Sequence, residues 1–290
     1  MMHRQAEETE MTMTAATAPD ATEVYALGSN PAESARLQRQ SDELRPQSAE
    51  LLGRIGLEPG KSAIDLGCGP SGILDLLSAA VFPGGRVVGL DADPAHTTMA
   101  RRHATERGLL NVDIVTADAR HTGLPSDSFD LVHARTLLVT IPEPEQVLAE
   151  MVRLTRPGGW IASQEPDIEN AFCYPPLPAW DRLREIFRIS FGRSGADLLV
   201  GRRLTELYRQ AGQEEIEVVV YAPVYPAGQS RRTILPDLVR SLRPMILDLE
   251  LTDEEELAAL DRAVRAHLAD PRTLVMSHLL VVTWGRKPPA

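Results

Sequence analysis

The segment that most constrains the fold is SAIDLGCGPSG, in which a short apolar run leads directly into three glycines. The apolar run predicts a buried strand over 62–66, and the apolar stretch after Gly72 predicts a helix from Ile73 to about Val81. Glycines at such a junction allow a sharp turn and a close approach of a ligand to the main chain. The segment therefore predicts an α/β fold, with either a nucleotide site or only a tight turn at the junction.

The same alternation continues along the chain. A second buried strand ends at Asp91, and Pro94 begins another helix. Further strands are predicted over 112–118, 129–135, 160–166, 214–221 and 277–285, with helices over 143–156, 179–191, 202–211 and 253–268. Apolar strands that alternate with helices predict a Rossmann-like, doubly wound and mostly parallel sheet with helices on both faces.

The remaining segments predict additions to this sheet. A charged stretch without an apolar core predicts a disordered tail over 1–22, and not a secretory signal. An amphipathic helix between Pro31 and about Ile55, broken at Pro46, predicts a helical lid over 23–58. The main domain is then expected over 59–290, with helical cap insertions at about 170–195 and 225–250. Its last helix, 253–268, begins with a capping-box pattern of Thr252 and Glu255.

Composition excludes several classes of protein. With 30 Lys and Arg against 41 Asp and Glu, the net charge is −11, which disfavours a nucleic-acid partner. No stretch approaches the roughly 18 apolar residues of a membrane span. Two cysteines, Cys68 and Cys173, are too few for a disulfide framework or a zinc site, and no other metal signature is present. We therefore expect a cytoplasmic protein with a small-molecule substrate and no metal.

Two aspartates near the glycine turn indicate the kind of ligand. Asp65 lies in the buried strand, where a carboxylate costs several kcal/mol unless a cation or a hydrogen-bond donor meets it. Asp91 ends the second strand, 24 residues after Gly67, where a carboxylate can accept both hydroxyl protons of a ribose. A nucleoside-containing ligand is therefore predicted.

Four segments in order, IDLGCGPSG, GLDAD, ADARHTGLPSDSFDLVHAR and RLTRPGGW, resemble the successive motifs of class I S-adenosylmethionine-dependent methyltransferases over about residues 62–165. More loosely, YALGSNPAESARLQRQ and GRRLTELYRQAG resemble bacterial small-molecule methyltransferases of natural-product biosynthesis. The resemblance implies a seven-stranded sheet of order 3-2-1-4-5-7-6 with an N-terminal lid and an inserted cap. It also implies S-adenosylmethionine as cofactor, S-adenosylhomocysteine as product, and methyl transfer to O, N or C of a small organic molecule.

The resemblance assigns residues to the methionine part of the cofactor. Gly67 and Gly69 would pack against it, and Asp65 would lie near its amino group, directly or through water. Ala134 and Arg135, at the end of the fourth strand, would border this part and the reaction centre.

The nucleoside part would be held at the next two strand ends. Asp91, followed by Ala92, would bind the ribose hydroxyls. Asp118 would accept a hydrogen bond from the adenine amino group, and the backbone N–H of Ala119 would donate to the ring.

Two added elements would close over the site. Tyr25 and Gln40 would act as a lid over the cofactor, although simple helix–sheet packing explains Tyr25 equally well. Aromatic side chains of the cap would shape an apolar substrate pocket or only pack the cap on the sheet: Phe172, Tyr174, Trp180, Phe187 and Phe191.

The chain departs from the family after the fourth strand. Many relatives carry a histidine there, whereas this chain has Leu-Val-Thr-Ile-Pro over 138–142, so a general base is not expected at this place, although Thr140 could contact a substrate. Glu165 and Asp167, at the end of the fifth strand, and Tyr174 are the candidate catalytic residues. Glu165 could equally serve as the partner of a helix or loop. Two other candidates are expected to be structural: His133 and His278.

Two other functions stay open. The fold could retain the cofactor and catalyse a different reaction such as cyclisation, in which case no S-adenosylhomocysteine would form. A nicotinamide-dependent oxidoreductase is less favoured, because the Asp118-Ala119 segment fits the methyltransferase pattern better. A homodimer is a further possibility.

Overall fold

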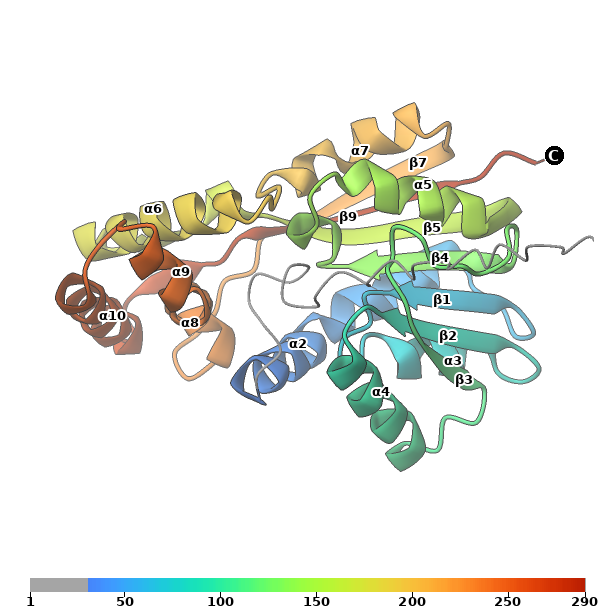
Figure 1. Cartoon of the computed structure of the whole chain (residues 1–290), viewed down its shortest axis with the longest axis horizontal. Coiled ribbons are helices and arrows are strands. Elements are labelled where there is room, and N and C mark those ends of the chain that lie inside the picture. The colour runs from blue at the N-terminus through green and yellow to red at the C-terminus, as the bar shows by residue number, and fades with distance from the viewer. Residues whose placement is uncertain (1–30, 290) are drawn as a thin grey trace, which may run out of the picture.

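The structure, a computed structural model, describes residues 31–289. At its centre is a seven-stranded sheet in the order β3-β2-β1-β4-β5-β9-β7 (Figure 1). Its strands are β1 (Ser62–Leu66), β2 (Arg86–Asp91), β3 (Val112–Thr116), β4 (Phe129–Arg135), β5 (Thr155–Asp167), β7 (Glu214–Tyr221) and β9 (Leu279–Arg286). The strands from β3 to β5 are parallel, and β9 runs antiparallel between β5 and β7. Numbered along the chain within this sheet alone, the order is 3-2-1-4-5-7-6, which confirms the predicted Rossmann-like fold.

Helices cover both faces of the sheet, because neighbouring residues of each buried strand point to opposite sides. On β1, Ala63 packs with α2 (Pro31–Ile55), α3 (Leu74–Val81) and α4 (Pro94–Glu106). The next residue, Ile64, packs on the other face with α5 (Pro144–Leu154) and α7 (Val200–Gln210). Continuous apolar strands are therefore required, as the sequence pattern indicated.

The first described helix, α2, is continuous through Pro46, so the predicted break is wrong. Proline removes one backbone hydrogen bond from a helix interior, at a cost of about 3 kcal/mol. The buried side chains of Leu44, Leu51 and Ile55 anchor the helix to the sheet on both sides of the proline. Tertiary packing thus outweighs the tendency of proline to interrupt a helix.

The predicted tail over 1–22 and Tyr25 lie outside the described residues.

A group of helices extends from the sheet at the left of Figure 1. We call it the helical cluster; it comprises α6 (Pro178–Arg193), η3 (Ser230–Thr233), α8 (Ile234–Ser241), α9 (Arg243–Asp248) and α10 (Glu254–Ala269). It also contains a two-stranded antiparallel sheet of β6 (Phe172–Tyr174) and β8 (Leu274–Met276), too short to detect from sequence periodicity. Helix α10 is capped by Asp253, whose carboxylate accepts from the Glu256 N–H, and not by Thr252 as predicted.

Candidate functional site

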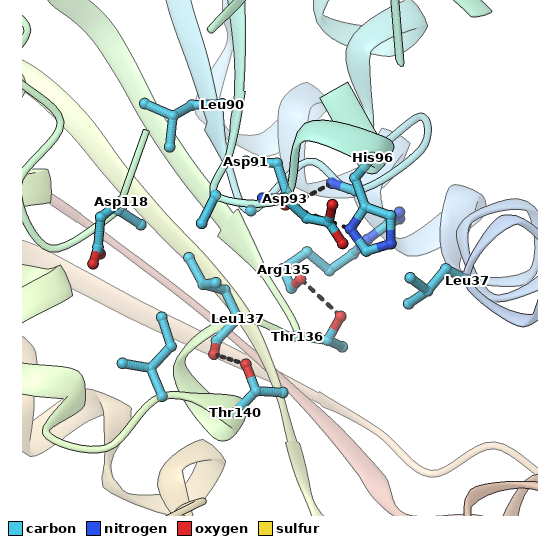
Figure 2. A pocket seen from close by; sticks show the side chains of 15 residues that line it. Leu37, Leu90, Asp91, Asp93, His96, Asp118, Arg135, Thr136, Leu137 and Thr140 are labelled. Atoms are coloured by element: carbon cyan, nitrogen blue, oxygen red, sulfur yellow. Dashed lines mark hydrogen bonds and ion pairs between the residues drawn. The ribbon is translucent and has the colours of Figure 1, made fainter. Parts of the chain in front are cut away.

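A cavity of about 760 Å³ lies at the carboxyl ends of β1, β2 and β4, beside α2 (Figure 2). Its walls include seven residues that the resemblance assigned to the cofactor: Gly67, Gly69, Asp91, Ala92, Asp118, Ala119 and Arg135. The walls also include residues that sequence reasoning did not single out: Leu37, Leu90, Asp93, His96, Thr136, Leu137 and Ile141. We call this space the main cavity.

Two glycines of the turn after β1 have no room for a side chain. Gly67 and Gly72 both have left-handed backbones, with φ of +65° and +50°. A Cβ atom on Gly67 would lie 2.7 Å from Leu137 Cδ1, and one on Gly72 would lie 2.0 Å from Asp65 Oδ2. The turn can therefore bring its main chain to the main cavity and to the buried Asp65 only with glycine at these positions.

At the end of β2, the carboxylate of Asp91 joins the turn to α4. Its Oδ2 accepts from the Gly69 N–H at 2.8 Å, and its Oδ1 accepts from the Asp93 N–H at 2.9 Å. His96 Nδ1 lies 3.4 Å from Asp91 Oδ1. Burial by itself lowers the pKa of His96, but the hydrogen bond and charge of Asp91 raise it above its ordinary value overall. A carboxylate has about four lone-pair positions, so Asp91 keeps capacity to accept from ligand hydroxyls.

Asp118 lies across the main cavity from His96 (Figure 2). Arg120 donates to it from Nε at 3.0 Å, from Nη2 at 2.6 Å and from its backbone N–H at 2.8 Å. Burial by itself raises the pKa of Asp118, but these bonds and the charge of Arg120 lower it below its ordinary value overall. Asp118 is therefore an ionised acceptor whose orientation is fixed by Arg120. Sequence reasoning did not assign that role to Arg120.

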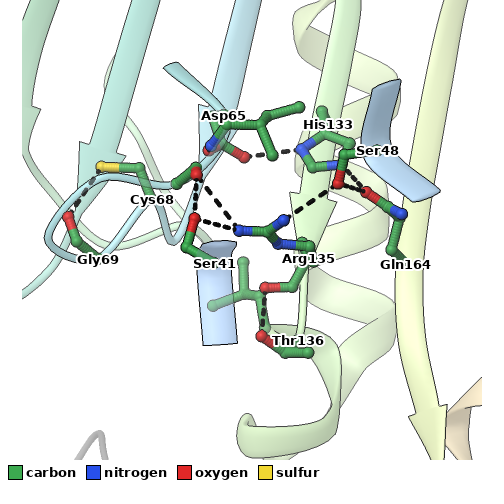
Figure 3. Close-up of polar contacts among 12 residues, drawn as sticks. Ser41, Ser48, Asp65, Cys68, Gly69, His133, Arg135, Thr136 and Gln164 are labelled. Carbon is green, nitrogen blue, oxygen red and sulfur yellow. Dashed lines mark hydrogen bonds and ion pairs between the residues drawn. The ribbon is translucent and has the colours of Figure 1, made fainter. Parts of the chain in front are cut away.

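Asp65 lies beneath the glycine turn, and not on the wall of the main cavity (Figure 3). It lines a smaller adjoining hollow instead. Its Oδ1 is 2.7 Å from Nδ1 of the fully buried His133, and its Oδ2 accepts from the Ile73 N–H at 3.0 Å. These two partners compensate for burying the carboxylate. Asp65 therefore stabilises the glycine turn after β1.

The polar contacts continue from His133 on β4 through Gln164 on β5 to Ser48 on α2 (Figure 3). His133 Nε2 is 3.0 Å from Gln164 Oε1, which also accepts from the Ser48 hydroxyl at 2.7 Å. Ser48 in turn accepts from Arg135 Nη1 at 3.0 Å. We call this set, from Asp65 to Arg135, the buried network. It connects β1, β4, β5 and α2 beneath the main cavity.

Arg135 is a buried cation next to both cavities. Its Nη2 donates to the Ser41 hydroxyl at 2.8 Å and to the Gly72 carbonyl at 3.2 Å. Burial lowers the pKa of Arg135 to about 10, against the opposing charge of Asp65. Within residues 31–289, no carboxylate lies within 4.0 Å of the guanidinium nitrogens. An anionic ligand group could supply that missing partner.

The other residues assigned to the cofactor occupy different places. Gln40 lies on α2, lines the smaller hollow, and donates from Nε2 to the Thr136 hydroxyl at 3.0 Å. Thr136 in turn lines the main cavity. Ala134 is fully buried in the core and does not line the main cavity.

Glu165, a predicted catalytic residue, does not reach the main cavity. Its fully buried carboxylate accepts hydrogen bonds at 3.0 to 3.1 Å from the backbone N–H groups of Leu137, Leu138 and Val139, at the start of η1 (Leu138–Thr140). Burial raises the pKa of Glu165 to about 7, although these three bonds oppose the shift. Glu165 therefore holds the loop that forms one wall of the cavity, which is the alternative role considered from the sequence.

The two other predicted catalytic residues are also absent from the lining of the main cavity. Asp167 is buried and accepts two hydrogen bonds from Arg202, at 2.6 and 2.8 Å. Tyr174 is 65% exposed on β6, at the edge of the helical cluster. The structure thus gives Asp167 an ion pair and leaves Tyr174 facing solvent, and neither is placed to take a proton from a molecule in the main cavity.

Thr140 does line the main cavity, and its hydroxyl donates to the Leu137 carbonyl at 2.8 Å.

Among residues 31–289, no group of three or more His, Cys, Asp or Glu side chains could hold a metal ion. Within the same range, no helix has the length and apolar character needed to cross a membrane. Cys68 and Cys173 are both buried free thiols.

Comparison with known proteins agrees with this geometry. The family described as "Methyltransferase domain" matches residues 64–163. Trans-aconitate 2-methyltransferase of Methylobacterium radiotolerans is 40% identical over 129 residues, which cover 44% of this chain and 47% of that relative. The chain therefore spans about half the length of that relative. The protein of the same name from Delftia acidovorans is 30% identical over 273 residues, covering 87% of this chain and 97% of that protein.

The fold is also that of a solved protein. The structure of a SAM-dependent methyltransferase from Aquifex aeolicus matches with a TM-score of 0.51 and 17% sequence identity, covering 90% of this chain and all of that one. At this identity the match shows a shared fold. The relative from Delftia, which the chain covers almost completely, shows the family. The chain belongs to the class I S-adenosylmethionine-dependent methyltransferases.

Proposed function

We propose that this protein transfers a methyl group from S-adenosylmethionine to a small organic acceptor, and that the main cavity is the cofactor site. The observation that carries the proposal is the arrangement of Asp91 beside Gly67 and Gly69. A strand-end carboxylate with spare acceptor capacity faces the same space as two glycines whose backbones have left-handed φ values, +65° at Gly67 and +54° at Gly69. Both relatives described above are methyltransferases by name, and both names specify a small acceptor.

The residues present fit the cofactor. Asp91 would accept from the ribose hydroxyls, and the ionised Asp118 would accept from the adenine amino group beside the Ala119 N–H. Arg135 would offer its buried charge to the carboxylate of the methionine part, and Gly67 would let that part approach the main chain.

Positioning accounts for most of the chemistry that the chain must perform. The bound cofactor supplies a methyl group on a cationic sulfur, which is already strongly electrophilic. The side chains of Leu37, Leu137 and Ile141 give the cavity an apolar wall that excludes water, and Glu165 fixes the loop that carries two of them. The three predicted catalytic residues lie elsewhere, so the site favours alignment of the acceptor over proton removal by a dedicated base.

Binding measurements test the proposal. Isothermal titration calorimetry with the full chain is expected to show binding of S-adenosylmethionine and S-adenosylhomocysteine but not of NAD. Asp91→Ala should weaken cofactor binding at least about tenfold, because the ribose hydroxyls lose a charged acceptor. Asp113→Ala, a change of an exposed aspartate on β3, is the matched control and should leave the affinity unchanged. Strong NAD binding without binding of the sulfonium compound would overturn the proposal.

Turnover separates methyl transfer from cyclisation. Formation of S-adenosylhomocysteine in step with consumption of an acceptor would support methyl transfer, whereas turnover of an acceptor without it would indicate a different reaction on the same fold.

A cytoplasmic location is supported by the two free buried thiols. Homodimer formation stays a prediction that light scattering on the purified protein would test.

A further inference from the structure

His96 stands beside the carboxylate that the proposed function assigns to the ribose. It lies in the first turn of α4, lines the main cavity, and is 4% exposed. Its Nδ1 atom is 3.4 Å from Asp91 Oδ1, and Figure 2 shows the ring turned toward the aspartates at the end of β2. His96 is therefore a third partner for a carboxylate that already accepts from two backbone N–H groups.

The two oxygens of Asp91 are unequally occupied. Oδ2 accepts from the Gly69 N–H at 2.8 Å, whereas Oδ1 accepts from the Asp93 N–H at 2.9 Å and also contacts His96. Each oxygen of a carboxylate offers about two lone pairs. Counting the partners within residues 31–289, Oδ2 has one position left, and Oδ1 has none while His96 stays in place.

A ribose would need a position on each oxygen. Its two neighbouring hydroxyls can both donate to one carboxylate, one hydroxyl to each oxygen. This adds a third donor to Oδ1 of Asp91, which exceeds its two lone pairs. One of the two present donors therefore has to leave when the ribose binds.

His96 is the donor that can leave. The Asp93 N–H belongs to the N-cap residue of α4, whose side chain accepts from the Ala95 N–H at 2.7 Å and so fixes the backbone. The His96 ring is held only through side-chain torsions. Its 3.4 Å contact to Asp91 is also long for a hydrogen bond, so a hydroxyl at about 2.8 Å would replace it.

The strongest charges acting on His96 come from carboxylates on three neighbouring elements. Burial by itself lowers the pKa of His96, but Asp91 on β2, followed by Asp93 at the start of α4 and Glu33 on α2, raises it above its ordinary value overall. A ring that leaves Asp91 loses the largest of these raising effects. Arg135, the buried cation on the same cavity wall, would further disfavour a proton on a ring that moves into the cavity.

We propose that His96 is a positioning residue of the cofactor site, which contacts Asp91 in the free protein and is displaced from it by the ribose hydroxyls. Displacement converts the imidazolium into neutral imidazole, the proton passes to the buffer, and no bond of the cofactor changes. Because linkage is reciprocal, a ligand whose binding releases a proton binds more tightly as the pH rises. This inference rests on the proposed function, because it describes how the ribose reaches Asp91.

The pH window follows from the two states of the ring. Below the pKa of the displaced ring, His96 is protonated with and without the cofactor, and above its raised pKa in the free protein it is neutral in both. Affinity is constant in those two ranges. Between the two pKa values only the free protein carries the proton, so affinity rises with pH. The upper value lies above the ordinary 6.5 of histidine, so measurements between pH 5.5 and 8.5 address this window.

The test uses the full chain and S-adenosylhomocysteine, whose sulfur carries no charge. Isothermal titration calorimetry at pH 7, in phosphate and in Tris, gives the number of protons released, because the two buffers differ in ionisation enthalpy. The wild-type protein is expected to release a fraction of a proton. Its Kd should fall at least about threefold between pH 6 and pH 8, which corresponds to a change of about half a unit in the pKa of His96.

Two histidine variants assign the proton. His96→Gln keeps an N–H donor beside Asp91 but does not titrate, so it should release no proton, and its Kd should change less than about 1.5-fold over the same range. His103→Gln is the matched control. It changes a histidine two turns further along α4 that does not line the main cavity, and it should keep the proton release of the wild type.

The outcomes separate the two proposals. Failure of S-adenosylhomocysteine to bind at every pH would contradict the proposed function. Binding to the wild-type protein without proton release would overturn the role of His96 and leave the cofactor site in place. Equal proton release by the wild type and His96→Gln would assign the proton to another group, and would overturn that role as well.

Discussion

His133 Nδ1 lies 2.7 Å from Asp65 Oδ1, in a contact that joins the centre of β4 to β1 directly beneath the glycine turn. Both side chains are buried, and the second oxygen of Asp65 accepts from the Ile73 N–H at the start of the following helix. One carboxylate thus holds a histidine of the core and the backbone that leads away from the turn. The position of the main cavity wall depends on this pair, although neither residue lines that cavity.

Removal of the Asp65 carboxylate should destabilise the protein strongly. Asp65→Ala leaves His133 and the Ile73 N–H without their buried acceptor, so we expect the free energy of unfolding to fall by about 3 kcal/mol. Urea denaturation measures this change. Asp113→Ala removes an exposed aspartate and should alter the free energy by less than about 0.5 kcal/mol. Equal losses of unfolding free energy in the two variants would show that the buried pair stabilises the protein no more than an exposed aspartate does.

Gly72 should be sensitive to a single added methyl group. In Gly72→Ala the new Cβ would meet Asp65 Oδ2 at 2.0 Å, in addition to the strain of a left-handed backbone. We expect a loss of about 3 kcal/mol or more in the free energy of unfolding. Gly56→Ala is the matched control, because Gly56 has φ of +68° and a Cβ atom added there would have no other atom within 4 Å. That control should cost only about 1 kcal/mol. Similar costs at both sites would contradict the close approach.

Glu165 should make stability depend on pH. Its pKa in the folded protein is raised to about 7, from an ordinary value of 4.5. Between these values the folded state binds a proton that the unfolded state has lost, so the contribution of Glu165 to stability is full below pH 4.5 and declines as the pH rises toward 7. The expected decline is about 3 kcal/mol. Urea denaturation at pH 5, 6, 7 and 8 measures it.

Glu165→Gln provides the comparison for that experiment. Glutamine keeps one carbonyl oxygen for the Leu137 and Leu138 N–H groups but does not titrate. The difference in unfolding free energy, wild type minus variant, should therefore become less favourable to the wild type as the pH rises. A difference that stays constant from pH 5 to pH 8 would mean that Glu165 does not change its protonation in this range.

Arg135 should couple α2 to the cofactor site. Arg135→Leu removes the hydrogen bonds to Ser41, Ser48 and the Gly72 carbonyl, so α2 should exchange its amide hydrogens faster. Affinity for S-adenosylmethionine should fall at least about tenfold, because a buried cation is lost from the site. Hydrogen-exchange mass spectrometry and calorimetry measure the two effects. Arg45→Leu, which removes an exposed ion pair between α2 and Asp75, should change neither.

The strand order and most of the cofactor cavity follow from local features of the sequence. Carboxyl ends of parallel strands meet at one edge of a sheet, so Asp91 and Asp118 had to face the same space as the glycine turn. The same argument predicted Glu165 and Asp167 at this edge. Both residues do lie at the end of β5, but neither lines the main cavity, because position along a strand does not say which partner a side chain meets.

Those partners are distant in the sequence. Glu165 accepts from N–H groups 26 to 28 residues earlier, and Asp167 pairs with Arg202, 35 residues later. Arg135 donates to Ser41, 94 residues away. Pro46 likewise suggested a helix break that the packing of α2 on the sheet prevents.

By itself, the sequence determined the α/β fold, the glycine turn and the carboxylates at the strand ends, because each depends on periodicity and backbone geometry over a few neighbouring residues. Only the tertiary structure decided that Asp65 pairs with His133, that Glu165 holds a loop, and that His96 lies beside Asp91. These outcomes depend on which side chains packing brings together, and on the cost of burying a polar group without a partner. Neither the packing partners nor this cost can be read from the spacing of neighbouring residues.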